Sequence, residues 1–532
     1  MSAATRPAGR VLFFVLAAGY AVFFLARWGW MNWDRSVRLE TARAEYGHDE
    51  FVDICLRTRD AALWRSWREN PPEVAVTKDG RPVATIAGLR RLRLHEADAG
   101  LWSGRWPCPW NAAPGGYGLE LSGAAVLADR LAVRPFRISR RRPWPLPRGF
   151  AVMTLEYDQP LAGLRVPAPD GKAKDWRGLL DWVQYVGADA FWVLGGRSPG
   201  RRPGEVWQSA NFPVFPAMAA ECRRRGIKFG IYVQCYLTQS DSERIPGYEY
   251  AREVRDGKSV LTRAVSLRDG RRARDVAELL KRFRDIPGVD YLGVDYIRNA
   301  LGGVELVDDF YADMAGVVPP PREFAALTPE ERMVYFARKK AMRKDMAFID
   351  AWQWWRAHRV AGIIRRIRAE VGGATPLWAF MLTWNKGWQH GQDAVMFNDA
   401  GVDAEALMLY EADSAQYAAI LSDWSRYARR GDAQLMVGDV VDWPLHQRSP
   451  DGPREFYRRM ARAMDGIYAD GPARGVFVHD LGRALRGRLG PWSTRDWLDA
   501  SRDAIRHFKA AQPAPAPAGR ISLPPEERER HP

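Results

Sequence analysis

The sequence predicts an α/β protein built around a closed (β/α)8 TIM barrel, preceded by a small Ig-like β-sandwich and an N-terminal membrane segment. Three observations lead to this fold class. The chain has 532 residues, enough for a barrel and an accessory domain. From Gly149 onward, strand and helix signals alternate, as in parallel α/β architecture. A short apolar strand ends on Asp295, and barrel active sites lie at the C-terminal ends of the strands.

Residues 1–33 are expected to form an uncleaved signal anchor. An apolar run of about 16 residues, from 11 to 26, lies between the length of a signal-peptide core and that of a full span. Trp28, Trp30 and Trp33 follow and suit an interfacial belt. The globular part would then lie in the periplasm or outside the cell. A cleaved signal peptide and a buried core helix are the alternatives.

The next three segments differ in texture. Residues 34–72 are expected to be a helical segment, with an apolar stripe that includes Leu56 and Leu63 and a break at Pro71-Pro72. Residues 73–138 carry short strands with turn signals at the spacing of an Ig-like β-sandwich. Residues 139–148, rich in Pro and Arg, are a predicted linker.

Residues 149–510 are predicted to form the barrel. Eight apolar runs read as its strands: Phe150–Glu156, Ala190–Leu194, Lys228–Gln234, Tyr291–Asp295, Pro376–Leu382, Ala406–Glu411, Gln434–Val440 and Gly475–His479. Six amphipathic segments read as helices between them: Trp176–Val186, Val214–Arg225, Arg271–Arg284, Ala347–Val371, Ser414–Arg430 and Arg454–Ala469. Residues 319–344 form an excursion between the fourth and fifth strands. The tail, 511–532, is expected to be disordered.

Composition excludes several classes of function. The charge of +15 is spread over scattered arginines, which indicates a solvated surface or, alternatively, attraction to an acidic glycan or an anionic membrane. No helix-turn-helix, zinc or RNA-binding signature is present, so we expect no nucleic-acid partner. Walker and G-x-G-x-x-G patterns are also missing from the sequence, and no cofactor is expected. The four cysteines have no metal spacing and His390 has no partner at such spacing, so no metal site is predicted, whereas a disulfide stays open.

Three segments resemble a bacterial family of glycosyl-hydrolase-like TIM-barrel proteins with an F-D-Y-I-R-like ending on the fourth strand. They are Phe215–Tyr232, Val294–Arg298 and Trp354–Val360. The resemblance covers roughly residues 150–505. It departs after Arg298, where Asn299-Ala300 replaces the family's aromatic-Pro pair, and over the first strand. The resemblance implies a glycosidase-like barrel with Asp295 as the leading catalytic carboxylate and Arg298 beside it.

Glycoside hydrolysis requires one ionised and one protonated carboxyl group. We assign Asp295 as the ionised nucleophile or base and Glu411, at the end of the sixth strand, as the acid. This pairing resembles that of alpha-galactosidase-like barrels. Asp439, Asp442 and Asp480 end the seventh and eighth strands and are the other candidates. Each of these carboxylates could instead cap a helix or pair with a barrel arginine.

Tryptophans indicate where a sugar could stack. The chain has 23 of them, and indole rings bind the apolar faces of sugars at low entropic cost. The residues expected to bind substrate are Arg298, Trp192, Trp384, Asn385, Lys386, Trp388, Asp439, Asp442, Trp443 and Asp480.

These features predict a hydrolase that acts on a cell-envelope or extracellular polysaccharide. Two alternatives remain: a non-catalytic carbohydrate-binding protein on the same scaffold, and an envelope-assembly protein. The separation of the Asp295 and Glu411 carboxyl groups would discriminate, since about 5 Å suits a retaining glycosidase and about 6.5–9.5 Å an inverting one.

Overall fold

The computed structural model describes residues 20, 22, 37–123, 127, 130–157, 159–202, 204–239, 244–298, 302–342, 345–410, 414–428, 433–441, 452–468, 475–486 and 491–512. The predicted membrane segment, except residues 20 and 22, and the predicted tail beyond residue 512 lie outside this part of the chain. Among the helices within it, none has both the length and the apolar character needed to span a bilayer.

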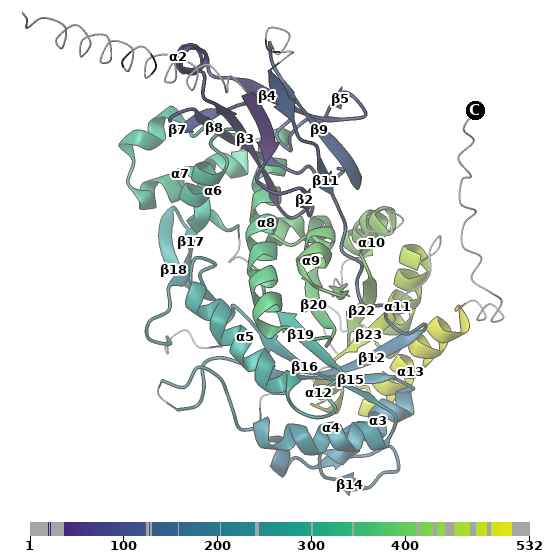
Figure 1. Cartoon of the computed structure of the whole chain (residues 1–532). Helices are drawn as coiled ribbons and strands as arrows, with labels where there is room; N and C mark the ends of the chain where they lie inside the picture. Colours follow the sequence, from purple (N-terminus) through teal and green to yellow (C-terminus); the bar gives the residue numbers. More distant parts are fainter. Residues whose placement is uncertain are drawn as a thin grey trace, which may run out of the picture.

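Eight parallel strands close into a barrel, which confirms the predicted α/β barrel (Figure 1). In barrel order they are β12 (Phe150–Leu155), β15 (Ala190–Gly196), β16 (Lys228–Gln234), β19 (Tyr291–Asp295), β20 (Leu377–Leu382), β21 (Ala404–Met408), β22 (Leu435–Val440) and β23 (Gly475–His479). Strand β12 pairs with both β15 and β23, which closes the ring. The sixth strand begins and ends earlier than predicted, so Glu411 comes three residues after its end.

Aromatic side chains fill the inside of the barrel. Trp192 stacks on Trp378 with ring centroids 4.1 Å apart and an interplanar angle of 13°. Glycines on the neighbouring strands make room for these rings, because a Cβ at Gly230 or Gly293 would lie 2.3 Å from an indole atom. The barrel therefore has a packed core, and its chemistry must lie at the strand ends.

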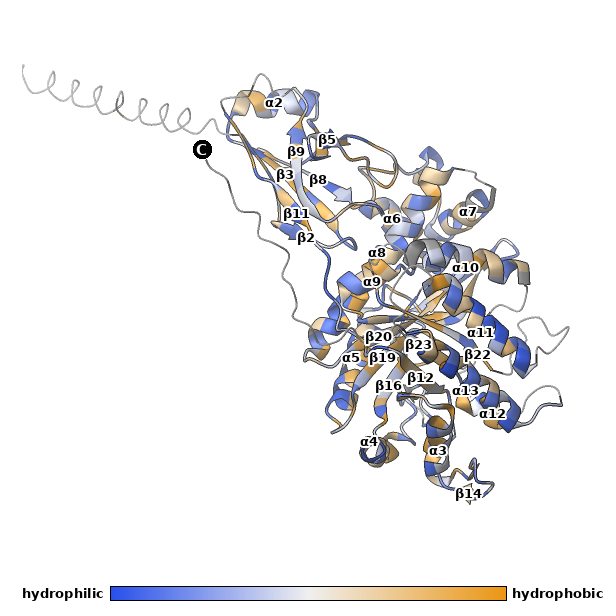
Figure 2. Cartoon of the chain, turned by 90° about the vertical axis from the view of Figure 1, so that its right-hand side faces the viewer, coloured by the Kyte–Doolittle hydropathy of each residue, from blue (hydrophilic) through white to orange (hydrophobic). Residues whose placement is uncertain are grey.

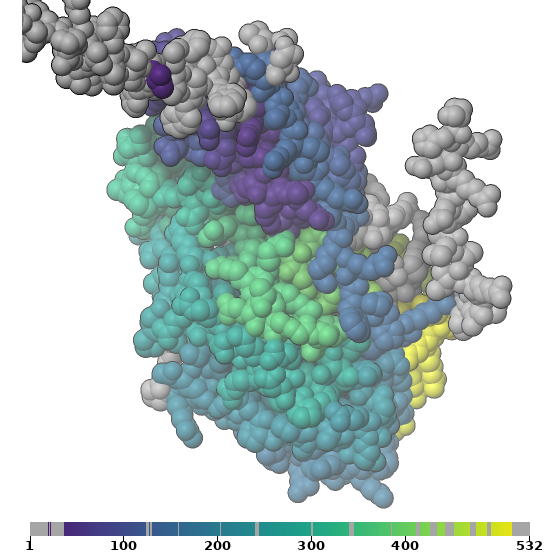
Figure 3. Space-filling model, viewed as in Figure 1, coloured from purple at the N-terminus to yellow at the C-terminus, as the bar shows by residue number. Residues whose placement is uncertain are grey.

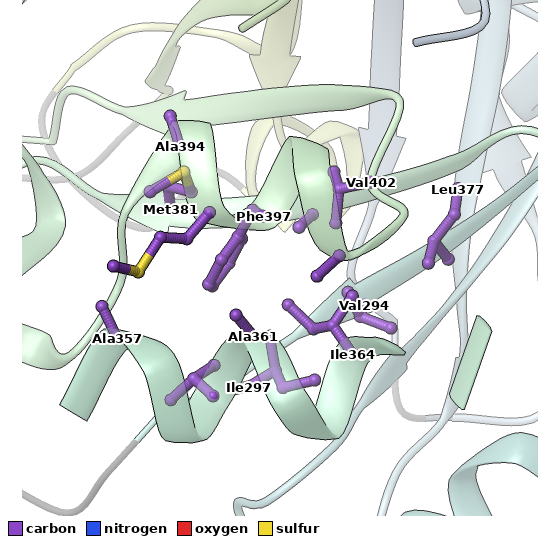
Figure 4. Close-up of a cluster of buried hydrophobic side chains, with 14 of the residues drawn as sticks. Val294, Ile297, Ala357, Ala361, Ile364, Leu377, Met381, Ala394, Phe397 and Val402 are labelled. Atoms are coloured by element: carbon purple, nitrogen blue, oxygen red, sulfur yellow. The ribbon is translucent and has the colours of Figure 1, made fainter. Parts of the chain in front are cut away.

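Helices cover the outside of the barrel (Figure 2). They are α3 (Arg177–Val186), α4 (Phe215–Arg224), α5 (Gly270–Arg284), α8 (Met346–Val371), α9 (Ala394–Ala400), α10 (Ser414–Ala428), α11 (Pro453–Tyr468), α12 (Leu481–Arg486) and α13 (Thr494–Ala510). A second apolar layer lies between α8, α9 and the barrel, where Ile297, Ala361 and Phe397 lie near one another (Figure 4).

Additional elements extend from the barrel loops. The hairpin β17 (Tyr250–Arg255) and β18 (Lys258–Val265) follows β16, and helices α6 (Val307–Asp313) and α7 (Pro329–Met342) follow β19. Helix α7 occupies most of the predicted excursion. The short hairpin β13 (Val166–Pro167) and β14 (Ala173–Lys174) precedes α3.

The N-terminal β-domain, residues 37–138, contains two sheets. The first has the order β10 (Leu131–Val133), β1 (Val37–Thr41), β3 (Phe51–Thr58), β8 (Leu101–Pro107) and β7 (His95–Asp98). The second has the order β2 (Glu45–Tyr46), β11 (Phe136–Ile138), β9 (Gly115–Leu121), β4 (Glu73–Lys78) and β5 (Arg81–Pro82), with β6 (Leu92–Arg93) paired to β4. Two pairings, β1 with β10 and β2 with β11, are parallel. Ig sheets are antiparallel, and the Ig-like character is not confirmed.

The predicted helical segment at 34–72 is wrong over most of its length. Strands β1 and β3 occupy it, and only α2 (Ala61–Glu69) is helical. In β3 the residues Val52, Ile54 and Leu56 alternate inward, which is the period of a strand rather than of a helix. Leu56 was predicted to belong to the same apolar helix face as Leu63. However, the Asp60 side chain caps the N-terminus of α2, so the helix begins only after Asp60.

The β-domain rests on the side of the barrel formed by α8 and α9 (Figure 3). Its contacts include buried charges: Arg365 of α8 binds the Asp49 carboxylate at 2.6 Å, and His48 Nδ1 lies 3.0 Å from Asp399 Oδ2. The predicted linker, 139–148, has no regular structure but is bound along its length. Arg141 reaches Asp403 Oδ1 at 2.8 Å and donates to the Val402 carbonyl at 2.6 Å.

Candidate functional site

The barrel strands bring a group of polar side chains together at their C-terminal ends. Charge interactions link the members of this group, which we call the strand-end cluster: Glu156, Gln234, Asp295, Tyr410, His479, Asp480 and Arg483. They come from the ends of β12, β16, β19, β21 and β23 and from α12. Only the folded barrel places these residues next to one another.

Asp295 ends β19 and is a buried carboxyl group at the C-terminal end of the barrel. Its side chain is 6% exposed, and the Tyr296 amide donates to its Oδ1 at 2.7 Å. Burial and the nearby charge of Glu156 raise the pKa of Asp295 to about 7, against the opposing effects of the Tyr296 amide, Arg298 and His479. Much of Asp295 is therefore protonated at neutral pH, which suits a proton donor better than the predicted nucleophile.

Glu156, which follows β12, has the opposite character. Gln234 Nε2 donates to its Oε1 at 3.1 Å, and His479 Nε2 lies 3.4 Å from its Oε2. Burial opposes ionisation, but the His479 hydrogen bond and the charges of His479, Arg483 and Arg197 outweigh it and lower the pKa of Glu156 to about 2. A quarter of the side chain, 26%, is exposed, so an ionised carboxylate is accessible here.

His479 is oriented by a chain of hydrogen bonds. Thr154 Oγ1 lies 3.3 Å from the Val478 carbonyl, to which it donates, and 2.8 Å from His479 Nδ1. Because its proton is used on the carbonyl, the threonine oxygen accepts from Nδ1–H. Nε2 then faces two carboxylates, at 3.4 Å from Glu156 Oε2 and 3.7 Å from Asp480 Oδ2.

Asp480 and Asp439 are each held by an arginine. The Arg483 backbone N–H donates to Asp480 Oδ1 at 3.0 Å, and Arg483 Nε lies 3.3 Å from its Oδ2. Arg459 Nη2 lies 2.8 Å from Asp439 Oδ2. Both aspartates are almost fully buried. They thus take the capping and ion-pair roles that the sequence left as the alternative to substrate binding.

Two phenol hydroxyls point into the strand-end cluster. The hydroxyls of Tyr232 and Tyr410 are buried and have no hydrogen-bond partner among the described residues. The Tyr410 ring stacks on His479, with centroids 5.5 Å apart and an angle of 14°. Burial, with the charges of Asp295 and Glu156 adding to it, raises the pKa of both phenols. Buried hydroxyls are normally paired, so these two are available to a ligand oxygen or a water.

Several predicted site residues lie outside the described part of the chain. Glu411, Asp442 and Trp443 belong to this group, and so does the side chain of Asn385. Their roles remain predictions, as does the separation of Asp295 from Glu411.

The predicted tryptophan loop forms the 3-10 helix η6 (Trp384–His390), and some of its side chains pack against other parts of the protein. Trp388 stacks on Trp110 of the β-domain, donates its Nε1–H to Asp393 at 2.6 Å and carries the Lys386 ammonium 4.3 Å from its ring. Trp384 packs against the core and keeps part of its surface. Trp192 has no exposed surface, so its predicted contact with substrate is corrected to a core role.

Glu156, His479 and Asp480 bring their ligand atoms within 4.8 Å of one another, as an ion would require. The residue types suit a hard or borderline cation. However, Arg483 already pairs with Asp480, and the charges of Arg483 and Arg197 act on Glu156. Arginine thus supplies the positive charge that a metal would bring, and these residues fit a metal poorly.

Four residues of the site were not predicted from the sequence: Glu156, His479, Gln234 and Tyr232. Glu156 directly follows an apolar strand in the same way as Asp295, so testing every strand end for a polar side chain would have found it. Gln234 and His479 also end strands that were predicted with the observed bounds. Tyr232 lies within a buried strand, at a position where an apolar side chain is expected. Only the folded structure shows that its hydroxyl reaches the strand-end cluster.

With this geometry described, the chain can be compared with known proteins. No protein-family model matches it, and no curated protein does. Similar solved structures include fungal β-1,4-galactanases, at 12% identity and a TM-score of 0.35 over 65% of this chain and 94% of that one. Others are a catalytic mutant of a GH42 β-galactosidase from G. stearothermophilus (11%, 0.45, 71% and 60%) and a GH5 enzyme from Streptomyces cattleya in complex with GlcNAc (13%, 0.40, 71% and 83%).

These similar structures are glycoside hydrolases, and the chain spans only 60% of the GH42 enzyme. Likenesses of this degree describe the barrel alone. An assignment of activity must therefore rest on the side chains of this chain.

Proposed function

We propose that this protein is a glycoside hydrolase in which Asp295 is the general acid. The observation that carries the proposal is the divergence of two neighbouring carboxyl groups: the pKa of Asp295 is raised to about 7, whereas that of Glu156 is lowered to about 2. Environments that push two carboxyl pKa values apart assign one group as acid and the other as base or nucleophile. Glycosidic cleavage uses such a pair.

In the proposed reaction, protonated Asp295 gives its proton to the glycosidic oxygen as the bond from that oxygen to the anomeric carbon breaks. An ionised carboxylate supports the developing positive charge, either by bonding to the anomeric carbon or by taking a proton from the attacking water. The water supplies the new hydroxyl group, and a proton returns to Asp295. Glu156 is the described candidate for the ionised partner. Glu411, which the sequence predicted as the acid, is a second candidate for this role now that Asp295 is proposed as the acid.

The cluster around these groups supports a sugar ligand. Tyr232, Tyr410 and Gln234 offer neutral donors and acceptors, which are the groups that bind hydroxyls. Trp384 keeps part of its ring available for stacking. The expected polysaccharide substrate and the export of the chain on an N-terminal anchor remain part of the proposal, and fractionation of the full chain against one that starts at residue 34 tests the anchor.

The decisive experiment replaces Asp295 by Asn and measures the release of reducing ends from a panel of neutral and acidic polysaccharides. We expect turnover to fall by about 10²–10⁴-fold, the usual contribution of a positioned acid. Asp290→Asn is the matched control, because Asp290 lies just before the same strand at its other end and binds Lys228 there at 2.8 Å.

Glu156→Gln and Glu411→Gln then identify the partner, since only the true base or nucleophile should match the loss seen with Asp295→Asn. If Asp295→Asn binds glycans but the native protein releases no reducing ends, the chain is a carbohydrate-binding protein and the proposed function fails.

A further inference from the structure

Arg356 of α8 is a buried cation without an anionic partner. Its side chain is 1% exposed, and Nη2 donates to the carbonyls of Trp388 and Gln389 at 3.1 and 3.2 Å. Nε and Nη1 have no hydrogen-bond partner in the described part of the chain, and burial lowers the pKa of Arg356 with no carboxylate there opposing it. A buried charge that is neither paired nor fully hydrogen-bonded is costly, and proteins keep one mainly where it has a use.

Two more basic groups converge on the same place. Arg298 follows Asp295 by three residues, with its guanidinium 4.9 Å from the Tyr296 ring. His390 ends η6, directly after the two residues whose carbonyls Arg356 holds. Burial, with the charges of Arg298 and Arg356 adding to it, lowers the pKa of His390 to about 4. We call Arg298, Arg356 and His390 the basic corner.

The basic corner adjoins the proposed acid. The charge of Arg298 acts on Asp295, and that of Asp295 acts on Arg298 in return. The corner and the strand-end cluster therefore belong to one site, with the two guanidinium groups on the side of β19 and α8 and the His390 ring on η6.

We propose that the basic corner binds an anionic substituent of the glycan, a uronic acid carboxylate or a sulfate ester, and makes the site selective for acidic polysaccharides. This inference rests on the proposed function and names its substrate class. The planar guanidinium groups suit the paired oxygens of both substituents. The overall charge of +15 would draw the same substrates toward the protein.

A purely bracing role for Arg356 explains only part of the geometry. Holding η6 uses one nitrogen, Nη2, and leaves the other N–H groups unsatisfied. Bracing also gives no reason for Arg298 and His390 to share the location. An anion would pair with the two guanidinium groups and accept a hydrogen bond from the neutral His390 ring. Once bound, it would offset the Arg298 charge that favours ionised Asp295, so the acid would keep its proton.

The test is a titration calorimetry experiment on the full chain with monosaccharide probes, which have no glycosidic bond for the protein to hydrolyse. The probes are glucuronate and galacturonate, their neutral parents glucose and galactose, and the 6-sulfates of those parents. We expect at least one acidic sugar to bind about tenfold or more tightly than its neutral parent, since charge-assisted hydrogen bonds add this much. The carboxylates and the sulfates are separate arms and identify the substituent.

Two variants assign the preference to the basic corner. Arg298→Gln and Arg356→Met, which keeps the side-chain volume, should each remove most of the acidic preference. Arg359→Gln is the control, because Arg359 lies on the same helix but faces Asp309, 3.9 Å away. If Arg356→Met does not fold, Arg298→Gln and the milder Arg356→Lys, which loses the planar fork, decide the matter.

Equal affinity for acidic and neutral sugars, or a preference that survives both substitutions, overturns the inference. Its failure is distinct from that of the proposed function. Turnover of neutral glycans with no charge preference would overturn the anion-binding role of the basic corner and leave the proposed hydrolase function standing. Selective binding of acidic sugars without turnover would overturn the hydrolase function and leave the anion-binding role standing.

Discussion

Trp110 of the β-domain lies flat against Trp388 of the barrel, with ring centroids 4.3 Å apart and 17° between their planes. Trp388 belongs to η6, the loop that also carries His390 of the basic corner. The accessory domain thus contacts the candidate site through one aromatic pair, and the shape of η6 depends on a residue almost 280 positions earlier in the chain.

Trp110→Ala should affect both stability and the site. Losing a stacked, half-buried indole should cost about 1–3 kcal/mol of unfolding free energy, less than a fully buried tryptophan. Because η6 loses its support, KM for the glycan should rise more than kcat changes. Urea denaturation and steady-state kinetics measure the two effects. Trp144→Ala, at an exposed tryptophan, is the control, and kinetics unchanged in Trp110→Ala would show that η6 does not need this contact.

Asp295→Asn should stabilise the protein while it removes activity. The pKa of Asp295 is about 7 in the folded chain and near 3.9 in the unfolded one, so the folded state binds more protons between these values. Native Asp295 therefore makes stability fall as pH rises from about 4 to 7. The asparagine variant should gain nothing near pH 3.5 and about 2–4 kcal/mol at pH 8. Thermal unfolding across this range measures the gain, and a constant difference at every pH would contradict the assignment.

Arg298→Gln should move the alkaline limb of the pH–rate profile. An acid must be protonated, so kcat/KM should fall as pH rises through the pKa of Asp295, about 7. The Arg298 charge lowers that pKa, and its removal should shift the limb toward higher pH. A profile of kcat/KM from pH 5 to 9 measures the shift. A limb that stays in place, or moves to lower pH, would assign the titration to another group.

Arg365→Met should destabilise the interface between the β-domain and the barrel in a pH-dependent way. Burial raises the pKa of Asp49 to about 6, although Arg365 opposes the rise. At pH 8 the substitution leaves an ionised, buried Asp49 unpaired, which should cost about 3 kcal/mol or more. At pH 5 Asp49 is largely protonated and the cost should be smaller. Chemical denaturation at both pH values gives the comparison, and Arg366→Met, on the same helix, is the control.

The barrel could be predicted because its strands carry their own signal. Runs such as Lys228–Gln234 and Tyr291–Asp295 are buried on both faces, so they stand out as continuous apolar segments, and the observed bounds match. The β-domain strands could not be placed as well. Residues 51–58 alternate polar and apolar positions next to a real helix, and the two patterns merged into one predicted helix.

The site was predictable at Asp295 and less so elsewhere. A carboxylate at a strand end is visible in the sequence, but the pKa of Asp295 depends on burial and on Glu156, which is 139 residues earlier. The sequence therefore indicated the residue but not the burial and the neighbouring charge that raise its pKa. The prediction that Trp192 contacts substrate was wrong for a related reason. Its position along β15 directs the side chain into the barrel, where Trp378 covers it.

The Pro/Arg-rich segment at 139–148 affects how the protein unfolds. Arg141 binds Asp403, and the Trp144 amide donates to the same carboxylate at 2.8 Å, so the segment is fastened to the barrel rather than suspended between two bodies. Together with the contacts of the buried Asp49 and His48, this segment leaves no hinge in the described part of the chain about which the β-domain could rotate. The two parts should unfold in a single cooperative transition. A fragment that begins at residue 149 would expose the charged surface of the barrel around Asp403, which the segment covers in the full chain.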